Sequence, residues 1–192
     1  MIYIALLRGI NVGGNNKVDM KLLKQTFEKA GMNHVTTYIN SGNIIFSSEG
    51  MSHQELADKL EQAIAADFGL NIRVLIRNLP EIREVISVLP EHWTNDAQMK
   101  GDVLFLWDEI NDRSVLDQIP VKPEIDTVIF VSGTILYSVS KANASRSGLI
   151  KLVGTKLYQH MTVRNVNTAR KIYTLMQAAE QEEGLGGIRE NK

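Results

Sequence analysis

The order of strand-like and helix-like patterns in residues 1–78 is the feature that most limits how this chain can fold. Short runs rich in apolar and β-branched residues predict strands, and apolar residues that recur every three or four positions predict helices. In chain order, the predicted elements are IYIALLR (2–8, strand), KLLKQTFEKAG (21–31, helix), HVTTYI (34–39, strand), NIIFS (43–47, strand), HQELADKLEQAIAADFG (53–69, helix) and NIRVLIR (71–77, strand). We expect Asp19 to cap the first helix, and Ser52 with Glu55 to form a capping box on the second. This β-α-β-β-α-β order is typical of the ferredoxin-like fold, an α+β fold.

The second half of the chain repeats this order of patterns. Its predicted elements are DVLFLW (102–107, strand), NDRSVLDQI (111–119, helix), DTVIFVS (126–132, strand), TILYSVS (134–140, strand), SGLIKLVGTKLY (147–158, helix), MTVRN (161–165, strand) and a final helix over 168–183. The segments NSGNIIFS (40–47) and VSGTILYS (131–138) are similar, and both fall at the hairpin of their half. Internal similarity at corresponding positions indicates a repeated unit. We therefore predict two tandem ferredoxin-like (alpha-beta plait) units that arose by internal duplication.

These units divide the chain into four predicted segments. They are a first ferredoxin-like unit (1–78), a helical linker (79–100), a second ferredoxin-like unit (101–166) and a C-terminal helix with a tail (167–192). The first strand is apolar at every position, so both of its faces should be covered. An RNA-recognition sheet would instead leave stacking aromatic residues on an open face.

Composition excludes several kinds of site. The chain has no cysteine, which rules out disulfides, thiolate metal sites and a cysteine nucleophile. The four histidines are scattered without metal-ligand spacing, and we expect neither a metal nor a cofactor. No apolar run reaches the length that spans a membrane, so we predict a cytoplasmic protein without a membrane partner. No residue can be named as catalytic, which favours a binding protein over an enzyme, and the sequence leaves the oligomeric state open.

Charge is distributed unevenly along the chain. Residues 1–126 hold 12 Lys and Arg against 18 Asp and Glu, whereas residues 127–179 hold seven basic residues and no acidic one. A basic stretch of this kind indicates an anionic partner, either a small molecule or a nucleic acid. The alternative is that these side chains pair with the acidic first half across an interface.

A first cluster of candidate ligand-binding residues follows from the predicted strand order. The loop after the first strand and the turn of the first hairpin should lie at the same end of the sheet, with Arg8 beside Asn43. The cluster consists of Arg8, Asn11, Gly13, Gly14, Asn40, Ser41 and Asn43. Backbone amides of a glycine-rich loop can bind a phosphate or carboxylate. Alternatively, Asn and Gly are present only because the loop needs positive φ angles.

A second cluster is expected in the other unit, where two loops lead into helices. Its members are Lys141, Arg146, Arg164, Asn165, Asn167 and Thr168. Two helix N-termini and three basic side chains would form a positive pocket suited to phosphate groups. The alternative is that Asn165 and Asn167 are ordinary helix caps.

Three blocks of sequence resemble the hallmark blocks of an uncharacterised bacterial family, domain of unknown function 1697. They are ALLRGINVGGNNKV (5–18), TYINSGNIIFSS (37–48) and TVRNVNTARKI (162–172), spread over nearly the whole chain. The third block usually carries an aromatic residue where this chain has Val166. The resemblance implies two ferredoxin-like units and no assigned activity, substrate or catalytic residue.

We interpret the chain as a cytoplasmic protein that binds an anionic ligand, such as a nucleotide, phosphate or nucleic acid, through the basic region 141–171. One alternative is a small-molecule enzyme with its site at the 8–18 loop and the 40–43 turn. Another is an interaction protein whose polar loops have only a structural role.

Overall fold

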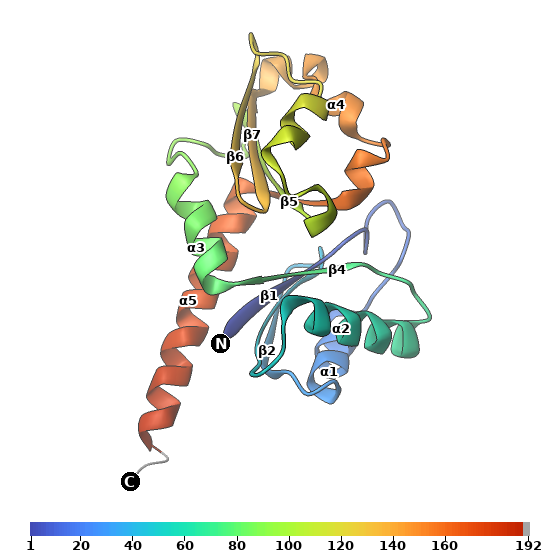
Figure 1. The fold of residues 1–192 in the computed structure, drawn as a ribbon, viewed down its shortest axis with the longest axis vertical. Helices are drawn as coiled ribbons and strands as arrows, with labels where there is room; N and C mark the ends of the chain where they lie inside the picture. The colour runs from blue at the N-terminus through green and yellow to red at the C-terminus, as the bar shows by residue number, and fades with distance from the viewer. Residues whose placement is uncertain (190–192) are drawn as a thin grey trace. The chain divides into compact units, whose positions relative to one another are not determined.

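The structure is a computed structural model that describes residues 1–189. The chain divides into two compact units (Figure 1). The first unit contains residues 1–83 and the C-terminal residues from Ile172 onward, and the second contains residues 84–171. The protein is therefore an α+β protein of two units, and each unit is described by itself below.

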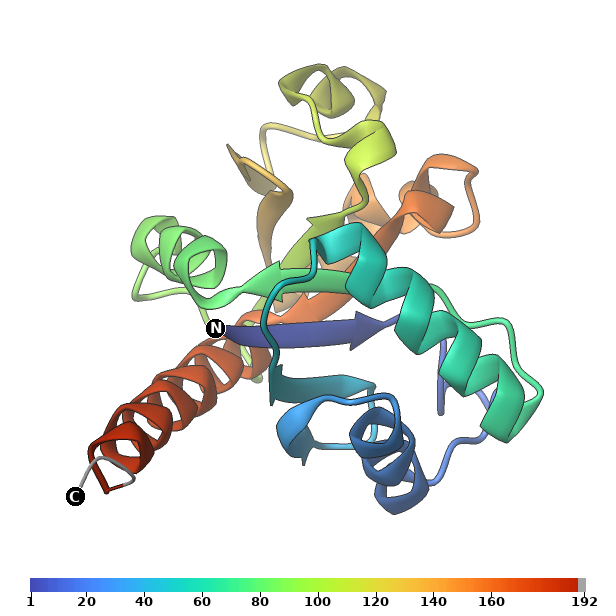
Figure 2. The ribbon, with the colours of Figure 1, turned by 60° about the horizontal axis from the view of Figure 1, so that its bottom comes forward.

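The first unit is built on a four-stranded antiparallel sheet. Its strands are β1 (Ile2–Leu7), β2 (Asn33–Tyr38), β3 (Asn43–Ser47) and β4 (Val74–Asn78), in the spatial order β2-β3-β1-β4. Two helices, α1 (Met20–Lys29) and α2 (His53–Phe68), lie on the same face of this sheet (Figures 1 and 2). Because β1 is a central strand and pairs antiparallel with β3, the loop after β1 and the β2–β3 turn lie at the same end of the sheet.

Both helices begin where the sequence predicts a cap. The side chain of Asp19 accepts a hydrogen bond from the backbone N–H of Leu22 at 2.8 Å. Ser52 and Glu55 form the predicted capping box at the start of α2. The second helix ends at Gly69, which has a φ of +66° and adopts the left-handed conformation typical of a helix C-terminus.

The core of the first unit lies between the sheet and its two helices. Large side chains of this core include Phe27 from α1, Leu60 from α2 and Phe46 from β3, all fully buried. On the opposite face of β1, Ile4 and Leu6 are also fully buried. Burial of β1 on both faces confirms the expectation drawn from its continuous apolar pattern.

The second unit contains a sheet with the same order of strands. They are β5 (Met99–Leu106), β6 (Asp126–Val131), β7 (Thr134–Ser140) and β8 (Met161–Asn165), arranged as β6-β7-β5-β8 with antiparallel pairing throughout. Each strand of this sheet therefore occupies the position of the strand four places earlier in the first sheet.

The connections of the second unit are less helical than the sequence predicts. Between β5 and β6 there are two 3₁₀ helices, η1 (Asp108–Ile110) and η2 (Arg113–Gln118), instead of one α-helix. The prediction of one continuous helix over 147–158 is wrong. The segment between β7 and β8 forms η3 (Lys141–Arg146), α4 (Leu149–Leu152) and η4 (Leu157–His160). Gly154, with a φ of +88°, interrupts the helical pattern because that conformation cannot continue a right-handed helix.

Two longer helices complete the chain. The first, α3 (Leu79–Val88), begins directly after β4, and the second, α5 (Val166–Arg189), begins directly after β8. The last helix is longer at both ends than the predicted range of 168–183. Its residues up to Lys171 group with the second unit, and those from Ile172 onward group with the first.

Candidate functional site

The loop between β1 and α1 is ordered by residues that adopt positive φ angles. Asn11 has a φ of +54°, Gly13 of +58°, Gly14 of +80° and Asn16 of +46°. The two glycines occupy the centre of a tight turn closed by an antiparallel bridge between Val12 and the residue after Gly14. Two successive positive φ angles define a type I′ turn, for which Gly-Gly is a favoured sequence.

The side chain of Asn11 connects this loop to the β2–β3 turn. Its Oδ1 accepts a hydrogen bond from the N–H of Val18 at 2.9 Å, and its Nδ2 donates to the carbonyl of Val18 at 3.0 Å. The same Nδ2 lies 3.0 Å from the carbonyl oxygen of Asn40. Asn11 therefore closes the loop and attaches it to a segment 29 residues away, as the first predicted cluster requires.

The 40–43 turn is packed tightly against the end of β1. Asn43 is fully buried, and its Nδ2 donates to the carbonyl of Tyr38 at 3.1 Å and to Ser41 Oγ at 3.0 Å. A β-carbon on Gly42 would lie 2.7 Å from Leu7 Cβ, so only glycine fits there. These contacts hold the shape of the turn, which gives Asn43 and Gly42 a structural role.

The register of the sheet shows where the backbone of Arg8 lies relative to the neighbouring strands. Asn43 lies opposite Leu6, two residues before Arg8. The backbone N–H of Arg8 donates to the carbonyl of Arg73, just before β4, at 3.2 Å. The backbone of Arg8 is therefore hydrogen-bonded on the β4 side of the sheet, while that of the preceding residue, Leu7, donates to the carbonyl of Gly42 at 2.9 Å.

A pocket of about 380 Å³ lies where the loop and the turn meet. It is lined by Asn11, Gly14, Lys17, Val18, Asp19, Met20 and Asn40. Three of the predicted residues thus share one pocket, whereas Arg8, Gly13, Ser41 and Asn43 are not among its lining residues. Lys17, the basic residue of this pocket, was missed by the sequence analysis, although it follows the Gly-Gly-Asn-Asn segment directly.

The second predicted cluster does not form one group of side chains. Lys141 and Arg146 are exposed at the two ends of η3. The backbone N–H of Lys141 donates to the carbonyl of Gln98 at 2.7 Å, and the carbonyl of Arg146 accepts from Lys122 Nζ at 2.6 Å. These contacts fix the backbone of the 3₁₀ helix and leave the two basic side chains at the surface.

Arg164 lies within β8 and is 7% exposed. Its guanidinium donates from Nη1 to Thr162 Oγ1 at 3.0 Å and to the carbonyl of Val163 at 2.8 Å. Burial lowers the pKa of Arg164 to about 10. Arg164 is therefore held along its own strand, away from the exposed side chains of η3.

The remaining members of the second cluster either cap the start of α5 or hydrogen-bond to a neighbouring segment. Asn165 Oδ1 accepts a hydrogen bond from the N–H of Thr168 at 2.8 Å, which caps the start of α5. Asn167 Nδ2 donates to the carbonyl of Asn95 at 3.1 Å. Side chains that satisfy helix N–H groups and neighbouring carbonyls in this way match the structural alternative given above.

Comparison with known proteins identifies the family. The family model described as "Protein of unknown function (DUF1697)" matches residues 1–137. The chain belongs to this family. The matched range includes both segments that form the Lys17 pocket and most of the second sheet, and it ends within β7.

A solved structure of another protein is similar to this DUF1697 chain. It is described as the conserved bacterial protein SP0830 from Streptococcus pneumoniae, and its TM-score is 0.78 at 31% sequence identity. The similarity covers 91% of this chain and 98% of that chain. No curated protein matches the chain. The comparisons therefore establish membership of a conserved bacterial family and assign no activity.

The structure reveals a repeated Arg-Asn pair in this DUF1697 protein that the sequence analysis missed. Arg77 in β4 is 7% exposed, and its Nη1 donates to the carbonyl of the preceding residue at 2.8 Å, just as Arg164 does in β8. Asn78 Oδ1 accepts from the N–H of Glu81 at 2.9 Å, as Asn165 does at the start of α5. The sequence contains this repeat as the dipeptide Arg-Asn at the end of the last strand of each half.

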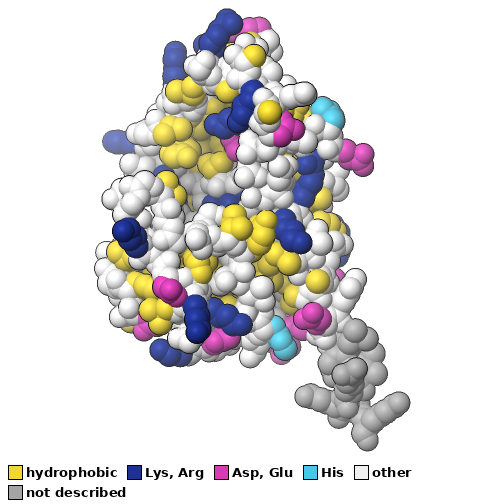
Figure 3. All heavy atoms as spheres, turned by 180° about the vertical axis from the view of Figure 1, so that it is seen from behind, with side chains coloured by type: hydrophobic (Ala, Val, Ile, Leu, Met, Phe, Trp, Pro, Cys, Tyr) yellow, Lys and Arg dark blue, Asp and Glu magenta, His cyan; other side chains and the backbone are white. Residues whose placement is uncertain are grey.

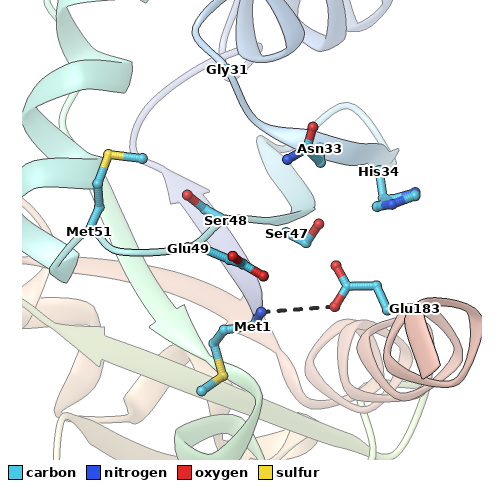
Figure 4. A pocket seen from close by; sticks show the side chains of 9 residues that line it. All are labelled: Met1, Gly31, Asn33, His34, Ser47, Ser48, Glu49, Met51 and Glu183. Atoms are coloured by element: carbon cyan, nitrogen blue, oxygen red, sulfur yellow. Dashed lines mark ion pairs between the residues drawn. The ribbon is translucent and has the colours of Figure 1, made fainter. Parts of the chain in front are cut away.

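Another pocket of the first unit, of about 380 Å³, is shown in Figure 4. Its lining residues are Met1, Gly31, Asn33, His34, Ser47, Ser48, Glu49, Met51 and Glu183. The amino group of Met1 lies 3.9 Å from a carboxylate oxygen of Glu183, so this carboxylate is paired across the pocket. Within residues 1–189, no group of three or more His, Asp or Glu side chains could hold a metal ion.

Two further observations bear on partners of this DUF1697 protein. No helix in the described part of the chain is both long and apolar enough to cross a membrane. On the face shown in Figure 3, Lys and Arg side chains lie among acidic and hydrophobic ones.

Proposed function

We propose that this protein binds a small anionic molecule in the pocket between the 8–18 loop and the 40–43 turn. The observation that carries the proposal is the meeting of Asn11, Gly14 and Asn40 around one pocket with Lys17. Two of these residues are joined by the hydrogen bond from Asn11 Nδ2 to the Asn40 carbonyl. The pocket is thus a preformed feature of the fold, which reduces the cost of ordering it when a ligand binds.

The chemistry of the pocket favours an anion. Lys17 supplies a positive charge, and the adjacent Gly13–Gly14 turn is exposed. Nothing lies within 4 Å of the positions that β-carbons on the two glycines would occupy, so a ligand can approach this backbone closely. Backbone amides in such turns are suited to phosphate or carboxylate groups. The carboxylate of Asp19 also lines the pocket, but it already accepts the N–H of Leu22 at 2.8 Å.

The size of the pocket favours a small organic molecule over a bare ion. A volume of about 380 Å³ lies within the range of roughly 300–1,000 Å³ that is usual for small-molecule sites. We therefore propose a phosphate-bearing metabolite, for which adenosine monophosphate and inorganic phosphate are suitable probes. The proposal moves the binding site from the basic region 141–171 to the first unit, because Arg164 is buried in β8.

The test is a titration of the ¹⁵N-labelled protein with each probe, followed by NMR. We expect shifts confined to the 8–18 loop and the 40–43 turn, and a reduction in affinity of about tenfold in Lys17→Gln, since one charge-assisted contact is worth roughly 1.4 kcal/mol or more. The control is Lys21→Gln, which removes the same charge from an exposed position on α1. Equal affinities in the two variants, or shifts that map elsewhere, would contradict the proposal.

The dependence of affinity on salt concentration distinguishes a nucleic-acid partner from a small phosphate-bearing molecule. Binding of duplex DNA through several phosphates would weaken steeply with rising salt, whereas a single phosphate contact gives a shallow dependence. An enzyme would need an acid or a base at this site. The carboxyl group that lines the pocket is that of Asp19, and it caps α1. Binding without turnover is accordingly the better-supported function. The cytoplasmic location stays a prediction from the sequence.

We further propose that both units are ferredoxin-like and that they arose by duplication. The common strand order, in which the first and third strands of each unit are central, supports the fold assignment. Equivalent Arg-Asn pairs at the ends of β4 and β8 support the duplication. The predicted boundaries at residues 78, 100 and 166 remain part of this proposal.

A further inference from the structure

The second unit contains a pocket of about 120 Å³ that is separate from the Lys17 pocket. Lys100, Asp102 and Leu104 alternate along β5, so their side chains project from the same face of the sheet. The pocket is lined by these three residues and by Tyr137, Ala144, Ser147, Leu149, Ile150, Val153, Tyr158 and Val163. Three neighbouring strands thus form its floor, and the segment between β7 and β8 covers it.

Asp102 is the carboxylate of this pocket, and its side chain pairs with that of Lys100, which also lines the pocket. Asp102 is 8% exposed and lies opposite Tyr137 in the sheet register. Its carboxylate forms an ion pair with Lys100, whose Nζ lies 3.6 Å from Oδ2, so the pocket presents one negative and one positive group side by side. Burial raises the pKa of Asp102, although the charges of Lys100 and Lys141 oppose the shift. The carboxylate has room for further donors besides Lys100, and a zwitterionic ligand can place an N–H donor on Asp102 and an anionic group on Lys100.

The other polar groups at the pocket are already engaged. The hydroxyl of Tyr137 donates to Asp126 Oδ1 at 3.1 Å and also hydrogen-bonds to the hydroxyl of Ser147. Ser147 Oγ in turn accepts the N–H of Leu149 at 2.9 Å. These hydrogen bonds hold the segment after η3 against the sheet and so maintain the shape of the pocket. Asp102 and Lys100 are then the charged groups that can contact a ligand.

We infer that this pocket binds a small aliphatic α-amino acid. The ammonium group of such a ligand can donate a charge-assisted hydrogen bond to Asp102. Its carboxylate would pair with Lys100, whose side chain is 43% exposed at the mouth of the pocket. The aliphatic side chain would pack against Leu104 and Val163, which face each other across β5 and β8. A volume of about 120 Å³ is below that of drug-sized sites and suits a ligand of few heavy atoms.

The experiment compares L-valine with two molecules that each lack one of its charges. Isobutylamine keeps the ammonium group, and isovalerate keeps the carboxylate. Binding to the full chain is measured by NMR titration and by isothermal titration calorimetry. We expect L-valine to bind more tightly than either analogue, with shifts confined to residues that line the pocket in the second unit.

Three variants assign the contacts. Asp102→Asn, which is nearly isosteric, should weaken L-valine binding by about tenfold or more, and Lys100→Met should weaken L-valine binding but not isobutylamine binding, because it removes both the partner of the ligand carboxylate and a competing cation at Asp102. The control Asp117→Asn removes a carboxylate from an exposed position of the same unit and should change nothing. Near-UV circular dichroism of each variant verifies that the pocket is still folded.

Three results would overturn the inference. They are tighter binding of isovalerate than of L-valine, retained L-valine affinity in folded Asp102→Asn, and the absence of saturable binding of any of the three molecules. The outcome is independent of the phosphate titration, because Lys17→Gln alters the first unit and should leave L-valine binding unchanged.

Discussion

Replacement of Asp126 by alanine should destabilise the second unit selectively. Asp126 is 6% exposed at the start of β6. Its carboxylate accepts hydrogen bonds from the N–H of Lys122 at 2.9 Å, from the N–H of Gly148 at 2.9 Å and from the hydroxyl of Tyr137 at 3.1 Å. It therefore joins β6 and β7 to the segment that precedes β6 and to the segment that follows η3.

The expected loss follows from these three bonds. A hydrogen bond to a charged group contributes about 1.5–3 kcal/mol, and a buried donor left without a partner costs about 1–3 kcal/mol. Because the bonds share one acceptor group and some donors can reach water, we expect a total loss of about 3–5 kcal/mol in the free energy of unfolding. Asp126→Asn keeps one acceptor oxygen and should fall between wild type and Asp126→Ala.

Tryptophan fluorescence can measure this loss in one unit of the intact chain. The chain has two tryptophans, Trp93 and Trp107, and both are buried in the second unit. Urea unfolding followed by fluorescence therefore reports on the second unit, whereas far-UV circular dichroism reports on both. Asp117→Ala, at an exposed position, is the control and should leave the urea midpoint unchanged.

The pH dependence of the loss has a defined sign. Burial alone would raise the pKa of Asp126, but the N–H groups of Lys122 and Gly148, with the hydroxyls of Ser147 and Tyr137, lower it overall. A carboxyl group with a lowered pKa in the folded state stabilises the fold above its unfolded pKa of about 3.9, and this contribution disappears as the pH falls through the folded pKa. The difference between wild type and Asp126→Ala should therefore be constant from pH 7 to 5 and shrink below about pH 4.

The reasoning would be refuted by a loss below about 1 kcal/mol at pH 7, the range of ordinary surface substitutions. It would also be refuted by a difference that grows as the pH is lowered, since the charged carboxylate is the group argued to accept the three bonds.

Three other substitutions test further contacts. Gly42→Ala should destabilise the first unit by more than about 1 kcal/mol, because its β-carbon would lie 2.7 Å from Leu7 Cβ at a φ of +74°; thermal unfolding followed by far-UV circular dichroism would measure it. Asn11→Ala should speed amide hydrogen exchange in the loop after β1 without lowering the global unfolding midpoint, and unchanged exchange would show that the loop is ordered by other contacts. Arg170→Ala removes a 2.6 Å hydrogen bond to the carbonyl of Trp93 and should lower the urea midpoint measured by fluorescence, whereas an unaltered midpoint would mean that this tie is dispensable.

Some of the candidate site could be predicted because loop composition reflects backbone geometry. The Gly-Gly pair and Asn11 indicated positive φ angles and a polar loop, and both are present in the structure. Lys17 was overlooked because a lone lysine after a loop has no distinguishing pattern. Its significance depends on the position of Asn40, which is brought near only when β3 pairs with β1.

The second cluster illustrates the opposite case. The residue types of the 164–168 segment are those expected of an anion site. Strand pairing, however, places Arg164 opposite Val103 within the sheet. The pocket at Asp102 could not be anticipated at all. A single Asp in an apolar strand carries no motif, and its environment is formed by Tyr137 from β7 and by the segment that covers the sheet.

By itself, the sequence determined the local structure: where strands alternate, where caps begin α1 and α2, and which family the chain belongs to. These features depend on neighbouring residues, whose preferences are encoded by side-chain shape and short-range hydrogen bonding. Only the tertiary structure decided which polar side chains are buried, which are exposed and which share a pocket. Burial and proximity depend on the register of strands far apart in the chain, and a shift of one residue would send each side chain to the other face.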